Sequence, residues 1–247
     1  MFDGCVWHLD RAGKFLGKWG AEGHGDGEFD TPLGICTSTI GDVYVVDTMN
    51  SRIQKFTREG KFLTAWGTGG PAPGQFHKPQ AASADDNGTL WVADTMNSRI
   101  QAFAADGSLK SIWGNPASGQ KPGQFYAPTG VVAAKDGAVY VADWGNDRVQ
   151  KLTRSGVSLS VWKMRNKDGS SLAPGNVGID RQGYVYVLNQ ADRAVLRLDS
   201  RGTVVAFIRV PLNDPTDMAV SRAGDIYVTS HTERLVVKLS PAAPKPR

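Results

Sequence analysis

An eight-residue segment that occurs twice constrains the fold of this chain more than any other feature. Residues 47–54 read DTMNSRIQ and return unchanged at 94–101, and a looser copy, DWGNDRVQ, stands at 143–150. Self-similarity at a fixed period is the signature of a repeat architecture. Two residue types keep the same spacing of 41 to 49 residues, namely Trp19, Trp66, Trp113 and Trp162, and Pro32, Pro79, Pro128, Pro174 and Pro215. The chain is therefore predicted to consist of copies of one structural unit.

Each copy contains four short runs with the character of β-strands. In the first complete copy they cover residues 34–36, 43–46, 52–56 and 61–66, are rich in β-branched and aromatic residues, and are separated by turn residues. No stretch of helical length has a 3.6-residue period. Glycine makes up 29 of the 247 residues, well above its usual share of about 7%. A four-stranded antiparallel meander in every 40 to 50 residues predicts an all-β fold, a β-propeller whose blades bury their faces against one another.

The chain resembles the NHL-repeat family of β-propellers over nearly its whole length. The resemblance rests on the opening Pro-x-Gly (Pro32 and Gly34), the segment VYVAD at 139–143, the Asp-x-x-Asn-x-Arg turn, and the closing segment GKFLGKWG at 13–20. This family usually closes six blades, the last of which is built from both chain ends. The resemblance therefore implies a six-blade type.

Blade boundaries follow from the repeat and predict one domain over residues 1–240. The predicted units are a partial blade at 1–26, blades at 27–70, 71–119, 120–169 and 170–210, and a last blade at 211–240 without its fourth strand. These make 21 strands, whereas six blades need 24 and five need 20. We expect a six-blade type that is incomplete at its N-terminus, with a five-blade closure through residues 14–20 as the alternative. The proline-rich residues 241–247 are expected to be a disordered tail.

Composition excludes several protein classes but fixes no compartment. A hydrophobic share of 40% and a charged share of 21% are typical of a folded chain, and no apolar run reaches the length of a membrane span. The residues contain no signal peptide, so the protein is expected to be secreted or periplasmic if a leader was removed, and otherwise cytoplasmic. Two cysteines, Cys5 and Cys36, are too few for a disulfide framework or a four-cysteine zinc site.

The polar residues that recur are predicted to be structural, because a blade is needed several times and a catalytic site once. A carboxylate at the end of one strand can accept hydrogen bonds from turn amides and from an arginine on the next strand, and asparagine tolerates the turn conformation. The predicted bracing residues are Asp47, Asn50, Arg52, Asp94, Asn97, Arg99, Asp143, Asn146 and Arg148. In the fourth and fifth units the set changes to Asn189, Asp192, Ala194 and to Ser230, Glu233, Leu235, so these blades are expected to be less well braced.

Recognition is predicted to lie where the units differ. The residue after the aspartate column varies, and long connections between blades carry cations. Met49 and Met96 are candidates for exposed apolar residues on the same face. The predicted ligand-binding face consists of Thr48, Thr95, Trp144, Gln190, His231, Lys78, Lys121, Arg165 and Lys167. The preferred function is a scaffold that binds a protein, peptide or glycan on this face, and the alternative is that these loops only connect blades. The oligomeric state stays open.

An enzyme is the first functional alternative. The related peptidyl-α-hydroxyglycine amidating lyases imply zinc-binding histidines directly after the opening prolines, where this chain has Leu33, Gln80, Thr129, Gly175 and Thr216. Zinc is therefore not expected and no cofactor is predicted, although a cation in the channel stays open. The candidate catalytic residues for a lyase or hydrolase are Asp217, His231 and Asn176.

Nucleic acid is the second alternative. Some NHL propellers bind single-stranded RNA on a basic face, and some bacterial propellers bind single-stranded DNA, which Trp144 and the loop cations would suit. The formal charge of +4 permits such a contact. However, the same loops carry Glu22, Asp26, Glu28, Asp30 and Asp168, which dilute the basic surface.

Overall fold

The computed structural model describes residues 4–114, 118–166 and 168–240 of the chain. The chain forms two compact units, Met1–Gly119 and Gln120–Arg247. The predicted tail at 241–247 and the predicted face residue Lys167 lie outside the described residues. The two helices of the described part are single 3₁₀ turns, η1 (Thr95–Asn97) and η2 (Trp144–Asn146), so neither has the length needed to cross a membrane.

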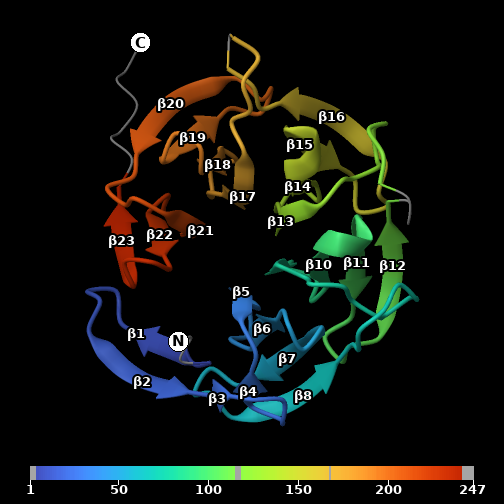
Figure 1. Cartoon of the computed structure of the whole chain (residues 1–247), viewed down its shortest axis with the longest axis vertical. Helices are drawn as coiled ribbons and strands as arrows, with labels where there is room; N and C mark the ends of the chain where they lie inside the picture. The colour runs from blue at the N-terminus through green and yellow to red at the C-terminus, as the bar shows by residue number, and fades with distance from the viewer. Residues whose placement is uncertain (1–3, 115–117, 167, 241–247) are drawn as a thin grey trace. The chain divides into compact units, whose positions relative to one another are not determined.

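The first unit contains two complete blades and two short strand pairs. A hairpin of β1 (Val6–Leu9) and β2 (Phe15–Trp19) is followed by a short parallel pair of β3 (Ala21–Glu22) and β4 (Glu28–Phe29). Two four-stranded antiparallel sheets follow, coloured blue to green in Figure 1. They consist of β5 (Pro32–Thr37), β6 (Val43–Asp47), β7 (Arg52–Phe56) and β8 (Phe62–Trp66), and of β9 (Ala81–Ala84), β10 (Leu90–Asp94), β11 (Arg99–Phe103) and β12 (Leu109–Trp113).

The second unit contains two further complete blades and a three-stranded one. Each sheet is a meander in which consecutive strands pair antiparallel. The complete sheets are β13 (Pro128–Ala133), β14 (Val139–Asp143), β15 (Arg148–Leu152), β16 (Ser158–Lys163), and β17 (Pro174–Ile179), β18 (Val185–Asn189), β19 (Ala194–Leu198), β20 (Val204–Arg209). The last consists of β21 (Pro215–Val220), β22 (Ile226–Ser230) and β23 (Leu235–Leu239).

The propeller of four-stranded antiparallel blades is thus confirmed, with five blades in the described part of the chain. The six-blade expectation is not supported, whereas the five-blade alternative agrees with this number. The physical reason is that the residues before β5 form only two strands of blade type, β1 and β2, too few for a further blade.

Tryptophans pack consecutive blades together. The Trp66 ring lies against Gly107 of the next blade, where an added Cβ would come within 2.8 Å of the ring. Trp19 contacts Gly60, and Trp162 contacts Gly202, in the same way. In these three cases a glycine turn leaves room for the indole of the preceding blade.

The turn between the second and third strands has the same backbone in all five blades, but its left-handed residue is not the one expected. The sequence pointed to asparagine, because that residue tolerates left-handed φ angles. The structure places this conformation one residue later, at φ values of 49° to 54°, in Ser51, Ser98, Asp147, Arg193 and Arg234. Asparagine stands earlier in the turn because its side chain is needed there as a hydrogen-bond donor.

Candidate functional site

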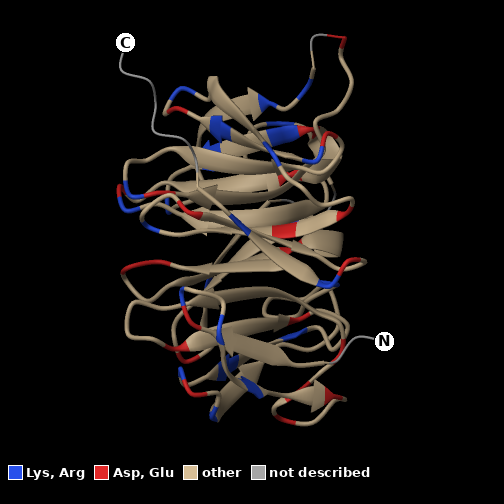
Figure 2. Cartoon of the chain, turned by 90° about the vertical axis from the view of Figure 1, so that its left-hand side faces the viewer, with Lys and Arg blue, Asp and Glu red and all other residues tan. Residues whose placement is uncertain are grey.

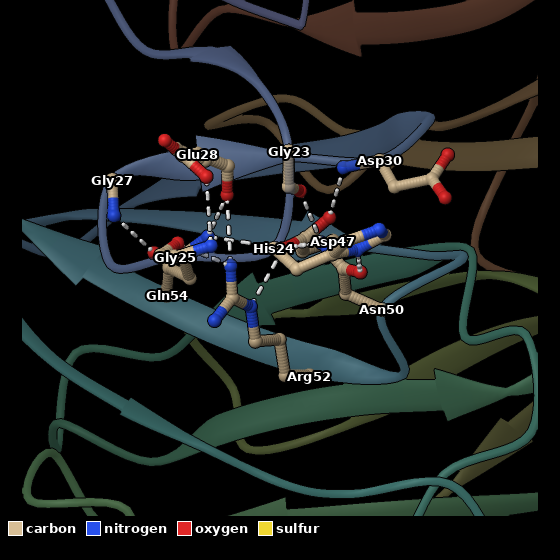
Figure 3. A network of polar contacts seen from close by, with 10 residues as sticks. All are labelled: Gly23, His24, Gly25, Gly27, Glu28, Asp30, Asp47, Asn50, Arg52 and Gln54. Atoms are coloured by element: carbon tan, nitrogen blue, oxygen red, sulfur yellow. Dashed lines mark hydrogen bonds and ion pairs between the residues drawn. The ribbon is translucent and has the colours of Figure 1, made fainter.

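Each complete set of repeated polar residues converges on one buried carboxylate. The Asp94 Oδ2 atom accepts hydrogen bonds from Asn97 Nδ2 at 2.9 Å, Arg99 Nε at 2.7 Å and Gln101 Nε2 at 3.1 Å. Its Oδ1 atom accepts the backbone N–H of His77 at 2.8 Å. Asp94 is fully buried, so these four donors replace the water that an ionised carboxylate needs. The same contacts surround Asp143, and Figure 3 shows them at Asp47.

The arginine of each set holds the loop that leads into its blade. The Arg99 guanidinium donates to the carbonyl oxygens of Pro71, Ala72 and Gln75 at 2.7 to 2.9 Å. Gln101 donates to the Gln75 carbonyl and accepts the N–H of Gly74. One carboxylate therefore orients two side chains that bind the inter-blade loop by its backbone, independently of that loop's side chains.

Glutamine completes each set and was missed by sequence reasoning. Gln54, Gln101 and Gln150 are fully buried, and each accepts a glycine N–H from the preceding inter-blade loop. The signal was present, since all three close the repeated octapeptide. It was overlooked because glutamine on a strand is ordinarily a solvated residue.

The fourth and fifth blades have a reduced set of contacts. Asn189 replaces the aspartate and exchanges hydrogen bonds with Asp192, and Ala194 stands where the arginine would be. In the fifth blade Ser230 accepts the N–H of Glu233, whose carboxylate binds Asn213 instead. With no arginine at these positions, weaker bracing of both blades stays a prediction.

Two residues of the predicted binding face, Thr48 and Gln190, donate hydrogen bonds to the next blade. Thr48 and Thr95 are buried, and the Thr48 hydroxyl donates to the Pro79 carbonyl at 2.8 Å. The Gln190 amide donates to the carbonyls of Pro215 and Thr216. The polar groups of Thr48 and Gln190 are therefore occupied, and the buried side chain of Thr95 is out of reach of a partner.

Two exposed aromatic side chains lie on neighbouring segments of the third blade, one in the loop that leads into β13 and one in the turn after β14. Trp144 is 47% exposed, and Tyr126, which sequence reasoning did not select, is 51% exposed. The Tyr126 N–H donates to Asp143 Oδ1 at 2.7 Å, and its carbonyl accepts the N–H of Gly145 at 2.9 Å. The bracing carboxylate thus fixes the backbone that presents both rings. Tyr126 could have been found from its column, which holds Asp30 and His77 in the earlier blades.

The other predicted face residues remain exposed. Arg165 donates to Asp147 Oδ2 at 2.6 Å and so stands beside the turn that carries Trp144. Lys121, Lys78 and His231 lie in loops, and His231 follows the last residue of β22. Met49 and Met96 are about half exposed, as predicted.

Two of the three candidate catalytic residues, Asn176 and Asp217, are hydrogen-bonded to each other. Asn176 on β17 donates to Asp217 Oδ1 on β21, and the same oxygen accepts the Met218 N–H at 2.8 Å. Asn176 also donates to the Met218 carbonyl. Burial raises the pKa of Asp217 to about 6, while the hydrogen bonds from Asn176 and Met218 oppose this rise. The described residues contain no group of three or more His, Cys, Asp and Glu arranged to hold a metal ion.

A known family of repeats matches the repeated segments of this chain. The NHL repeat family matches residues 29–56, 76–103 and 125–152, each running from a buried phenylalanine to the end of a third strand. These segments contain the three complete sets of bracing residues. The chain is an NHL-repeat β-propeller. No curated protein sequence matches it.

Solved structures similar to this NHL propeller include two lyases and a nidogen/laminin complex. A virginiamycin B lyase from Staphylococcus aureus has a TM-score of 0.62 at 16% identity, covering 86% of this chain and 71% of the lyase. A streptogramin B lyase has a TM-score of 0.63 at 15% identity, covering 86% and 70%. A chain of a nidogen/laminin complex has a TM-score of 0.72 at 15% identity, covering 98% and 87%. At such identities the likeness shows the fold alone.

A second recurring contact of this NHL propeller was also missed. Tyr44 on β6 stands opposite Lys55 on β7, with the ammonium 5.6 Å from the ring centroid and 2.8 Å from the Asp42 carboxylate. Tyr140 with Lys151, and Tyr227 with Lys238, repeat the arrangement. Burial raises the pKa of Tyr44, so its hydroxyl stays protonated. The signal was a lysine eleven residues after a tyrosine in three blades.

Proposed function

We propose that the chain is a binding scaffold that recognises a protein or peptide through an aromatic patch, defined as Tyr126, Trp144 and Arg165. The observation that supports this most is the exposure of two large rings on a backbone held by Asp143. Tryptophan, tyrosine and arginine are the residues that most often dominate binding energy at protein interfaces. A pre-formed backbone lowers the entropy lost on binding. The proposed role of the recurring Asp, Asn, Arg and Gln residues is to keep that backbone rigid.

Charge supports a partner with acidic residues. Eighteen Lys and Arg against eleven Asp and Glu give residues 120–247 a formal charge of +7, whereas ten against thirteen give residues 1–119 a charge of −3. Figure 2 shows charged residues in many of the loops and near strand ends. Lys121 is exposed in the loop that Arg148 holds, five residues before Tyr126. An acidic peptide with an apolar anchor therefore suits this patch.

A peptide selection with paired variants tests the proposal. The whole chain is immobilised and used to select from a random twelve-residue library, and the selected peptides are measured by calorimetry. We expect acidic peptides whose affinity falls at least tenfold in the double variant Tyr126→Ser/Trp144→Ser. The matched control is Phe207→Ser, which removes a similarly exposed aromatic side chain from β20. Equal binding to the wild type and the double variant would contradict the proposal.

A further inference from the structure

Strand β1 has the position of a third strand in an incomplete blade. Val6 pairs with Trp19, just as Ile53 pairs with Trp66 and Val149 with Trp162. In the complete blades the other edge of the third strand pairs with the second strand. β1 pairs only with β2 among the described strands, so its other edge offers unpaired backbone groups.

Side chains on β1 are exposed where their counterparts are buried. Trp7 is 57% exposed, whereas Gln54 and Gln150 at the equivalent position are fully buried. Leu9 is 40% exposed, whereas Phe56, its counterpart on β7, is 1% exposed. Two apolar side chains in water are the consequence of the unpaired edge.

The first strand of the following blade is uncovered in the same way. Ile35, opposite Val45, is 50% exposed. Its counterpart Val177, opposite Val187, is only 4% exposed because it belongs to a core cluster with Tyr140 and Ala142 on the second strand of the preceding blade. Among the described strands none takes this place before Ile35, since β1 and β2 correspond to third and fourth strands. Strand pairing and side-chain burial thus indicate the same empty position, that of a second strand.

Charge around this position indicates a basic occupant. Between β2 and β5 the chain has four acidic residues and no Lys or Arg. One of them, Glu22, lies beside Gly4, two residues before β1, because an added Cβ on Gly4 would come within 2.6 Å of the Glu22 backbone. A strand antiparallel to β1 would bring its C-terminal end to this place, so a Lys or Arg there would be favoured.

We propose that the free edge of β1, together with Trp7, Leu9 and Ile35, is a docking site for an extended segment of another polypeptide, which adds antiparallel to β1 as a second strand. The segment has alternating apolar residues and a Lys or Arg at its C-terminal end. Backbone hydrogen bonds along the edge give affinity, and the apolar side chains select the register. This surface lies in the first unit and is independent of the aromatic patch.

A labelled peptide taken from the chain's own repeat tests the proposal. Residues 128–143 supply a first and second strand, and Asp143→Lys in the peptide supplies the cation. We expect fluorescence anisotropy to show saturable binding to the full chain, weakened at least tenfold by Ile35→Lys. Val157→Lys is the matched control, since Val157 is 60% exposed in the second unit. A peptide ending in glutamate should bind more weakly.

Hydrogen exchange distinguishes strand addition from non-specific adhesion. Bound peptide should slow exchange of the amides of residues 6–9 and leave those of β16 unchanged. The proposal is overturned by absence of binding at about 1 mM peptide, by equal weakening in the Val157→Lys control, or by binding without protection of β1. Dimerisation of the chain alone that Ile35→Lys abolishes would also overturn it, because a second copy would then occupy the edge.

Discussion

Removing one bracing carboxylate should strongly destabilise the chain. Asp94 is fully buried and accepts four hydrogen bonds, and Arg99 beside it is 4% exposed. Asp94→Ala leaves four donors without this acceptor and the buried guanidinium without its carboxylate. Breaking a buried ion pair from one side costs about 3–5 kcal/mol. For a chain of this length we expect the unfolding midpoint to fall by roughly 6–20 °C.

Urea unfolding followed by tryptophan fluorescence and circular dichroism measures the effect. In a double-mutant cycle, Arg99→Leu should rescue part of the loss caused by Asp94→Ala, because the uncompensated charge is then removed. Glu59→Ala, in an exposed turn, is the control and should change stability by less than about 0.5 kcal/mol. A loss below about 1 kcal/mol for Asp94→Ala, or strictly additive effects, would refute the reasoning.

Three further predictions concern single positions. The folded chain binds the Asp217 proton more tightly than the unfolded chain does, so the free energy of unfolding falls as pH rises from about 4 to 6. After a discount for partial exposure, Asp217→Asn should raise the free energy of unfolding, measured in urea, by about 1–2 kcal/mol at pH 7.5 and leave it unchanged below pH 4. A loss of stability at both pH values would contradict this prediction. Gly107→Ala should lower the free energy of unfolding by about 2–3 kcal/mol, because the added Cβ meets the Trp66 ring, whereas Gly88→Ala, whose Cβ meets no neighbour, should lower it by about 1 kcal/mol. Equal losses in the two variants would contradict a close contact between Gly107 and Trp66. Burial raises the pKa of Cys36 to about 12, so a disulfide reagent at pH 8 should modify it slowly in the folded chain and rapidly in urea, as mass spectrometry would show.

Strand positions were largely predictable because they depend on local chemistry. The repeated β-branched and aromatic runs predicted four strands per unit, and the first complete blade has them within one or two residues of the expected places. The tryptophan contacts were predictable because a large ring repeated at one position needs a partner in the next unit. The left-handed residue was misplaced, since Asn50 and Ser51 both suit a turn and only the contact of Asn50 with Asp47 separates them.

The binding face was less predictable because exposure depends on the neighbouring blade. Thr48 and Trp144 occupy the same column, yet Thr48 is buried by a hydrogen bond to the next blade and Trp144 is half exposed. Tyr126 was missed because it lies in a loop and its column holds a different residue type in each of the first three blades, namely Asp30, His77 and Tyr126. Asn176 and Asp217 were both selected as candidate catalytic residues, but the rise in the pKa of Asp217 depends on burial that the sequence does not show.

Hydrogen exchange at three backbone amides tests most directly whether the recurring carboxylates hold the inter-blade loops. Asp30, His77 and Tyr126 each donate a backbone N–H to a buried aspartate Oδ1 at 2.7 to 2.8 Å. We predict that these amides exchange as slowly as those of the adjoining strands, and that Asp94→Asn accelerates exchange at His77 alone. A bracing role would be contradicted if all three amides exchanged as fast as those of an exposed loop, or if Asp94→Asn left exchange at His77 unchanged.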